Sequence, residues 1–248
     1  MLQIIKASEK QRLDGETRGR DQELSLESQL LLSLWYLRHY TTFLFLGLQF
    51  GVSEATACRI AIKIENILIK SKDFHLPGKK KLSQSDLVRV ITDATESRIQ
   101  RPTKGQRHHY SGKKKYHTTK TQIIIESVKN TIQCMDFSNG KKHDKALYDE
   151  SKVKLKEETD NQVDSGYQGI QKTHNKTTIP MKKPKGRKLT KEEKRENRKR
   201  RKGRMIIEHV IRMLKRFRVV SDVYRNRRKR FGLRMNLIGG IYNYELAN

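Results

Sequence analysis

Apolar residues recur at helical spacing in the first third of the chain. Leucines at every third or fourth position predict a helix over residues 24–38, and an apolar stretch predicts a shorter one over 42–49. Ser53 is a typical N-cap and predicts the start of a third helix just after Gly51. Two helices joined by so short a turn are typical of a helix-turn-helix. A plain three-helix bundle without a nucleic-acid role is the alternative. The residues expected to face outward from the third helix are Ser53, Thr56, Arg59 and Lys63.

Further along, the hydrophobic pattern becomes typical of strands. Residues 87–91 predict a strand that ends at Asp93, and residues 161–163 predict a weak strand before Asp164. An aspartate that follows a strand commonly only forms a turn. Two such aspartates could instead meet at the edge of one sheet.

Between these strands, β-branched residues predict an antiparallel pair. The runs 116–128 and 131–137 are separated by a two-residue turn, and a short helix is expected over 144–153. The pattern therefore favours a mixed sheet with helices around it.

The last third of the chain returns to helical spacing. Residues 204–217 predict an amphipathic helix in which Arg204 and Glu208, four positions apart, share a face. This pair is either a surface ion pair or a sign that Glu208 turns toward a carboxylate site. A final helix is expected over 233–246, interrupted at Gly239-Gly240.

These elements predict an α+β or α/β chain in which a small all-helical domain precedes a mixed β-sheet flanked by helices. The predicted divisions are a polar leader at 1–22, a helix-turn-helix domain at 23–72, a linker at 73–86, and a sheet-containing domain at 87–248 with a basic arm at 182–204.

The net charge of the chain indicates the class of its partner. The 248 residues include 55 Lys and Arg against 27 Asp and Glu, which gives a formal net charge of +28. Such an excess repels itself unless a polyanion neutralises it, and nucleic acid is the commonest such partner. An anionic membrane surface is the rival. Within the strongly basic stretch 107–115, Lys113, Lys114 and Lys115 are expected to contact DNA. The arm at 182–204 is either a solvated, partly disordered segment or a mobile arm that clamps phosphates.

Several classes of protein are disfavoured. No run approaches the ~18–20 uncharged apolar residues of a membrane span, and the beginning of the chain does not resemble a secretory signal. Cys58 and Cys134 are far apart and lack histidines at zinc-binding spacing, so free thiols in a reducing cytoplasm are expected.

The acids suggest a chemistry. Asp93, Asp164 and Glu208, brought to one place, would repel one another and hold protons, and a divalent metal would relieve that cost. Oxygen ligands of this kind suit Mg²⁺ or Mn²⁺. Two such ions about 3.5–4 Å apart activate a water or a 3′-hydroxyl toward a phosphodiester.

Six blocks in one continuous order carry a resemblance to a known family. They are Val-Ile-Thr-Asp-Ala-Thr-Glu at 90–96 followed by Arg101-Pro102, the basic stretch 110–120, Lys142-His143-Asp144, Asp-Ser-Gly-Tyr-Gln-Gly at 164–169, the spaced set Arg204-x3-Glu208-x6-Lys215, and the basic and apolar stretch 225–245. The chain, over residues 24–248, resembles an insertion-sequence transposase of the Asp/Asp/Glu superfamily, whose catalytic domain has the RNase H-like fold. Arg201 stands where the family signature has tyrosine, and residues 160–163 are more polar than the family's strand.

The resemblance implies roles for individual residues. Asp93, Asp164 and Glu208 would be the catalytic residues and would bind two Mg²⁺ or Mn²⁺ ions, while Arg204 and Lys215 would contact DNA beside them. It also implies the partners, which are double-stranded DNA at terminal inverted repeats and at the target, within a DNA-bound homodimer. Such an enzyme would work in the bacterial cytoplasm, on the nucleoid. The residues implied as helpers are Glu96, His143 and Asp144.

Two other functions remain open at this stage. A catalytically inactive DNA- or RNA-binding protein would share the charge without the metal chemistry. Binding of the basic arm to a membrane surface is the weaker alternative.

Overall fold

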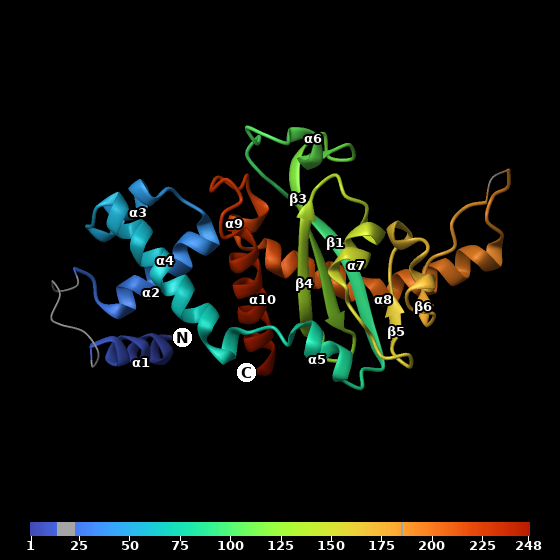
Figure 1. Cartoon of the computed structure of the whole chain (residues 1–248), viewed down its shortest axis with the longest axis horizontal. Helices are drawn as coiled ribbons and strands as arrows, with labels where there is room; N and C mark the ends of the chain where they lie inside the picture. Colours follow the sequence, from blue (N-terminus) through green and yellow to red (C-terminus); the bar gives the residue numbers. More distant parts are fainter. Residues whose placement is uncertain (14–22, 185) are drawn as a thin grey trace. The chain divides into compact units, whose positions relative to one another are not determined.

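The computed structural model describes residues 1–13, 23–184 and 186–248 (Figure 1). The chain forms two compact units, each with its own interior. Unit 1 consists of residues 1–75 together with 214–248, and unit 2 consists of residues 76–213.

Unit 1 is helical. Its elements are α1 (Leu2–Leu13), α2 (Leu26–His39), α3 (Phe43–Phe50), α4 (Glu54–Lys70), the 3-10 turn η1 (Lys72–Phe74), α9 (Arg218–Ser221) and α10 (Phe231–Ala247). The three helices α2, α3 and α4 confirm those predicted from hydrophobic spacing.

Local capping fixes where these helices begin and end. The hydroxyls of Ser25, Thr42 and Ser53 each accept a hydrogen bond from a backbone N–H three residues later, which satisfies one of the free donors of a helix N-terminus. Gly51 ends α3 with φ 70°, a left-handed conformation that glycine adopts without strain. The turn of the helix-turn-helix therefore depends on this glycine.

The beginning of the chain differs from the expected polar leader. Residues 2–13 form α1, while residues 14–22 lie outside the described residues. Ile5 is fully buried, and the nearly buried Glu9 pairs with Lys63 of α4 at 2.6 Å. Lys6 also pairs with Glu27 of α2 at 2.8 Å. Apolar burial and these ion pairs thus hold a helix that has little amphipathic character in its sequence.

Residues 214–248 pack with the helical unit, whereas the sequence placed them in the sheet-containing domain at 87–248. Helix α10 continues without a break through Gly239-Gly240, where an interruption was expected. The reason is close packing, because a β-carbon on Gly240 would lie 2.0 Å from the carbonyl oxygen of Phe74. Gly240 allows α10 to approach η1 closely, and the helix does not end at the glycine pair.

Unit 2 contains a mixed sheet. The strands that the structure describes are β1 (Arg89–Arg98), β2 (Tyr110–Ser111), β3 (Tyr116–Glu126), β4 (Ile132–Asn139), β5 (Asp160–Gln162) and β6 (Thr177–Thr178). The main order is β4-β3-β1-β5-β6, and β2 extends the sheet at the beginning of β3. The strands β1, β3 and β4 are antiparallel neighbours, while β5 runs parallel to β1 and β6 parallel to β5. The mixed sheet flanked by helices confirms the predicted α+β class.

Strand β1 is longer than predicted. It continues from Arg89 to Arg98, so Asp93 lies in the middle of the strand and not at its end. The strand continues because it pairs with β3 residue by residue, and Asp93 lies opposite Ile123. Tertiary pairing therefore overrides the local signal of a polar residue after an apolar run.

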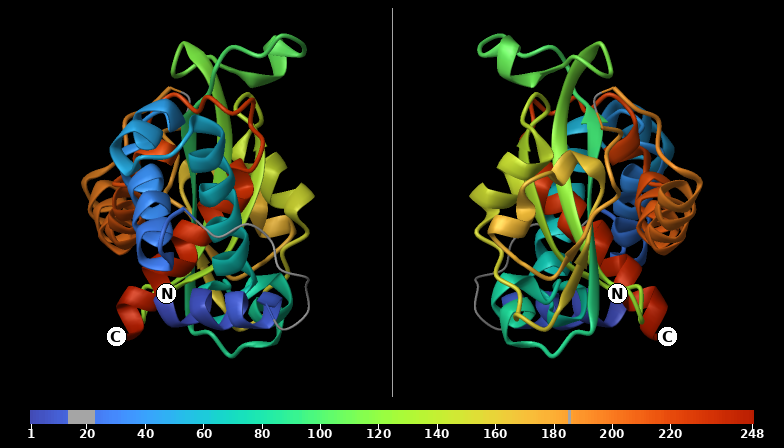
Figure 2. Two further views of the ribbon diagram at one scale, coloured as in Figure 1. Left: turned by 90° about the vertical axis from the view of Figure 1, so that its left-hand side faces the viewer. Right: turned by 90° about the vertical axis from the view of Figure 1, so that its right-hand side faces the viewer.

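Helices cover both faces of this sheet. In both views of Figure 2, α7 (Asp144–Ser151) and α8 (Lys191–Lys215) lie on opposite sides of the strands. The α7 side is closed by an apolar cluster that includes Val90, Ile124 and Tyr148. On the α8 side, the amide of Gln162 donates to the carbonyl of Arg200.

The segments expected to be a linker and a basic arm both contain helices of unit 2. Within the expected linker at 73–86, α5 (Gly78–Gln84) buries Leu82 in the apolar cluster. Much of the basic arm belongs to α8, which is one helix of 25 residues from Lys191 onward. The remaining short elements are α6 (Gln106–His109), η2 (Ser165–Tyr167) and η3 (Ile170–Lys172).

Candidate active site

A cleft of about 500 Å³ opens in unit 2 where β1, α7 and α8 come together. The acidic residues on its wall are Asp93, Glu96, Asp144 and Asp164. Its cationic residues include Arg204, Lys113 and Lys120. The cleft thus combines clustered carboxylates with positive charge, which suits a phosphodiester substrate.

Asp93 occupies the inner part of this site. Its Oδ1 accepts a hydrogen bond from the N–H of Ala94 at 2.8 Å, and its Oδ2 accepts one from Arg204 Nη2 at 3.1 Å. Burial raises the pKa of Asp93 above its ordinary value, and the charge of Asp164 adds to this, although Arg204 and the Ala94 N–H oppose it. The ionised carboxylate is therefore not fully compensated by its protein partners.

Asp164 reaches the same site from the neighbouring strand. It stands two residues after β5, the parallel neighbour of β1, and its Oδ1 caps η2 by accepting from the N–H of Gly166 at 2.7 Å. The sequence correctly put a short strand before Asp164. Strand pairing then brings Asp164 close enough to Asp93 for their charges to interact.

Asp144 joins the two aspartates from the first turn of α7. A β-carbon on Gly166 would lie 2.5 Å from Asp144 Oδ2 and 2.9 Å from Asp164 Oδ1, so both carboxylates border this glycine. Asp144 Oδ1 also pairs with Lys120 Nζ at 2.7 Å. The sequence marked Asp144 only as a helper, and its place at a helix start after Lys142-His143 was the available signal.

Tyr167 lies beside the carboxylates and was not singled out from the sequence as a site residue. Its side chain is fully buried, and its hydroxyl has no hydrogen-bond partner among the described residues. Burial raises its pKa well above the usual value, and the charges of Asp144, Asp93 and Asp164 raise it further. The available signal was its position in the glycine-bounded turn that follows Asp164.

Glu208 is placed differently. It is exposed on α8 and does not line the cleft. It stands one helical turn after Arg204, on the same side of the helix as the residue that pairs with Asp93. Among the described residues, no group of three or more His, Cys, Asp or Glu is arranged to hold a metal ion.

The donor chemistry of the cleft nevertheless fits a hard divalent cation, because its acids offer carboxylate oxygens. Asp93 is paired with Arg204 and Asp144 with Lys120, so two cationic side chains now compensate the acids that an ion would otherwise stabilise.

The residues expected to bind DNA lie in both units. In unit 2, Lys113, Lys114 and Lys115 are exposed in the turn before β3, and Lys113 also lines the cleft. Lys215 is the last residue of α8 and is half-buried within unit 1. These positions leave Lys113 as the expected DNA contact closest to the carboxylates, apart from Arg204.

The residues predicted to face outward from α4 differ in exposure and in their contacts. Ser53 and Arg59 are exposed, and Thr56 accepts hydrogen bonds from both of their side chains. Lys63 is half-buried and its ammonium contacts Glu9 and Gln29. The first turn of α4 is therefore the part that presents free polar surface.

Comparison with known proteins identifies the family of the chain. Residues 92–238 match the family described as DDE superfamily endonuclease, and residues 22–72 match the helix-turn-helix of DDE superfamily endonuclease. The chain is 47% identical over 251 residues to the "Probable transposase for insertion sequence element IS702" of Microchaete diplosiphon, an alignment that covers 100% of this chain and 89% of the relative. No solved structure matches significantly.

None of the helices in the described ranges is both long and apolar enough to cross a membrane. The endonuclease match includes the two aspartates and the glutamate of the sequence-based triad, and the helix-turn-helix match coincides with α2, α3 and α4. The chain therefore belongs to the insertion-sequence transposases of the DDE superfamily, with a helix-turn-helix at its N-terminal side.

Proposed function

We propose that this chain cuts and joins phosphodiester bonds at the terminal inverted repeats of an insertion sequence, with two Mg²⁺ or Mn²⁺ ions as cofactors. The convergence of Asp93 and Asp164 in one cleft, from neighbouring parallel strands, is the observation that carries this proposal. The family's known dependence on divalent metals supports it.

Asp93 and Asp164 would hold the ions, and Glu208 would complete the ligand set from the next turn of α8. When bound, the ions supply an activated water or 3′-hydroxyl and stabilise the leaving oxygen of the phosphodiester. Arg204 leaves Asp93 in this arrangement and binds a phosphate oxygen with its guanidinium, which suits phosphate geometry. Lys113, at the mouth of the cleft, orients the same strand.

The helix-turn-helix would select the DNA. Ser53, Thr56 and Arg59, at the N-terminal end of α4, lie at the position from which a recognition helix reads base edges. We propose that Lys63 stabilises α1 and contributes little to DNA contact, because its ammonium is already engaged with Glu9. Lys114, Lys115 and Lys215 would contact backbone phosphates. The acting species would be a DNA-bound homodimer that joins two element ends and inserts them into a target on the nucleoid.

One observation favours a second function. Glu208 is exposed and Asp93 is paired with Arg204, so the three acids of the triad are not assembled in this conformation. A catalytically inactive DNA- or RNA-binding protein would show the same arrangement.

A cleavage assay separates the two functions. The substrate is the DNA that flanks the gene of this chain, including its terminal repeats, and nicking is measured with Mn²⁺ for the wild type and for Asp93→Asn. We expect the substitution to lower the nicking rate by roughly 10³-fold or more. Catalytic residues act as a unit, so replacing one of them removes most of the rate enhancement that they provide together.

Asp86→Asn is the matched control, since Asp86 is an exposed aspartate of unit 2 that pairs with Lys156 and does not line the cleft. It should nick like the wild type. Equal DNA binding by all three proteins with no nicking by any of them would favour the inactive binding protein.

A further inference from the structure

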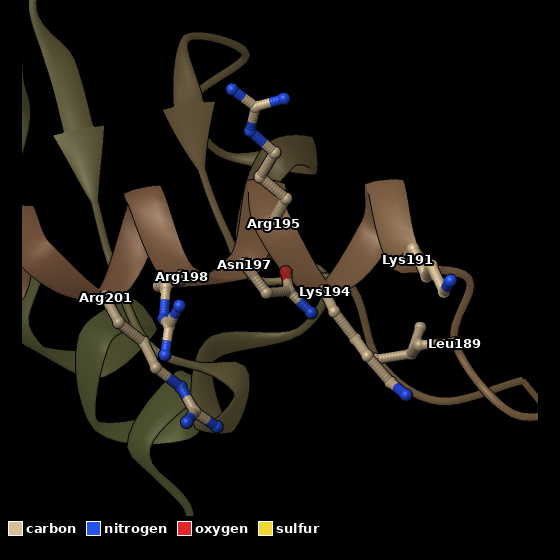
Figure 3. A pocket seen from close by; sticks show the side chains of 7 residues that line it. All are labelled: Leu189, Lys191, Lys194, Arg195, Asn197, Arg198 and Arg201. Carbon is tan, nitrogen blue, oxygen red and sulfur yellow. The ribbon is translucent and has the colours of Figure 1, made fainter.

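The N-terminal half of α8 carries a row of cations away from the carboxylate cleft. Figure 3 shows Lys194, Arg198 and Arg201 extending from the same side of the helix, with Lys191 at its beginning. They line an open pocket of about 630 Å³. Their spacing of three, four and three residues is that of one helical face. We call these four residues the α8 basic row.

Within the described parts of the chain, no acid forms a salt bridge with this row, although the exposed Glu192 lies next to Lys191. The nearby Glu193 pairs with Arg187 at 2.7 Å, and Glu196 pairs with Arg200 at 3.3 Å. Every member of the α8 basic row is exposed, and none has a salt bridge among the described residues. Four adjacent positive charges of this kind repel one another unless an anion neutralises them.

Hydrogen bonds to the preceding segment hold the part of α8 that carries the row. Asn197 binds the backbone of Met181 twice, donating to its carbonyl at 3.0 Å and accepting from its N–H at 2.9 Å. Arg200 Nη1 donates to the carbonyl of Ile179 at 2.6 Å. Asn197 and Arg200 thus anchor the helix to the preceding segment, and the helix presents the cations in a fixed order.

The dimensions suit a nucleic-acid backbone. At 1.5 Å per residue, the row from Lys191 to Arg201 spans about 15 Å, a length over which one strand of a duplex presents about four phosphates. Arg204, three residues after Arg201 on α8, pairs with Asp93 in the cleft. A strand that follows the row is thereby led toward the carboxylates.

We infer that the α8 basic row binds the phosphate backbone of double-stranded DNA adjacent to the bond that is cut. This inference rests on the proposed function, and it adds a contact surface outside the cleft and outside the helix-turn-helix. The ligand is the DNA backbone, whether it belongs to the element end or to the target.

The test compares two neighbouring substitutions that remove the same charge. Arg198→Gln alters the row, whereas Lys199→Gln alters an exposed residue of the same helix that does not line the pocket. Affinity for duplex DNA is measured over a range of salt concentrations in the full chain, and circular dichroism melting checks that each variant is folded.

Each phosphate contact contributes about 0.9 to the slope of log affinity against log salt. We expect Arg198→Gln to lower this slope by about 1 and the triple variant Lys194→Ala/Arg198→Ala/Arg201→Ala by about 2–3. Lys199→Gln should leave the slope unchanged. Equal effects of Arg198→Gln and Lys199→Gln, or an unchanged slope in the triple variant, would overturn the inference.

Two DNA arms identify the source of the backbone. Loss of affinity for terminal-repeat duplex alone assigns the row to the element end, loss for unrelated duplex alone assigns it to the target, and equal loss assigns it to both. Nicking is followed in parallel. If the wild type nicks DNA and the triple variant binds DNA as tightly as the wild type, the proposed function stands and the inference that the α8 basic row binds DNA is refuted. If the wild type fails to nick DNA and the triple variant loses salt-dependent binding, the proposed chemistry is refuted and the inference about the α8 basic row is supported.

Discussion

The most buried arginine–carboxylate pair among the described residues of unit 1 differs from that of unit 2 in how completely its groups are satisfied. In unit 1, Glu65 and Arg234 are both 1% exposed in their side chains. Glu65 Oε1 accepts from Arg234 Nε at 2.7 Å and Oε2 from Arg230 Nε at 2.8 Å. Arg234 also donates to Tyr224 and lies over the ring of Tyr36. This network ties α4 to α10.

In unit 2, the Asp93–Arg204 pair is more open. It has one contact of 3.1 Å, its side chains are 14% and 15% exposed, and Arg204 Nε is buried without a partner in the described part of the structure. Burial raises the pKa of Asp93 in spite of Arg204. The comparison teaches that a closed charge network stabilises a fold, whereas an incompletely satisfied one leaves groups available for a ligand.

The largest effect on stability is expected in the closed network. Glu65→Gln removes the charge that compensates Arg234 and Arg230, so it should lower the free energy of unfolding of unit 1 by about 3–5 kcal/mol. Chemical denaturation followed by circular dichroism measures the change. Glu54→Gln is the control, because Glu54 is an exposed residue of the same helix. Equal stability of the two variants would mean that the network in unit 1 is not structural.

A smaller effect is expected in the open site. Mn²⁺ at ~10 to ~100 times its dissociation constant should raise the free energy of unfolding of unit 2 by about 1.4–2.7 kcal/mol, because only the folded site gathers its ligands. Thermal melting with and without the ion measures this. Asp93→Asn should abolish the increase, while Asp86→Asn should keep it. An equal increase in Asp93→Asn would show that the ion binds elsewhere.

The smallest effect concerns the cysteines, one in each unit. Burial raises the pKa of Cys134 in β4 from 9.0 to about 12. The folded state therefore favours the neutral thiol of Cys134. This contribution to the free energy of unfolding of unit 2 is fully present below pH 9.0. It is lost as the pH rises through about 12, because between these values only the thiol of the unfolded chain ionises. Cys58 in α4 is half-buried.

At pH 8 a thiol reagent should modify Cys58 first and should reach Cys134 only when unit 2 opens. Mass spectrometry after timed labelling distinguishes the two residues, and Cys58→Ser gives a probe of unit 2 alone. Labelling of both cysteines at one rate would contradict the separate opening of the two units.

Some features of this protein followed from the sequence alone. Ser53 and Gly51 specify the start of α4 and the turn before it because capping and left-handed backbone are local requirements. The run of β-branched residues between Thr118 and Ile125 predicted β3 in the same way. The order of blocks around Asp93 and Asp164 was enough to identify the superfamily, which the comparisons then confirmed.

Other features were decided only by tertiary contacts. The pairing of β1 with β3 continues the strand past Asp93, and the position of Asp144 beside Asp164 depends on how α7 meets the turn at Gly166. Residues 214–248 join unit 1 because Glu65, far away in the sequence, binds Arg234 of α10. Local sequence specifies caps and periodicity, since these depend on neighbouring residues. It does not specify which distant charge or strand will satisfy a buried group, because that requires the folded chain.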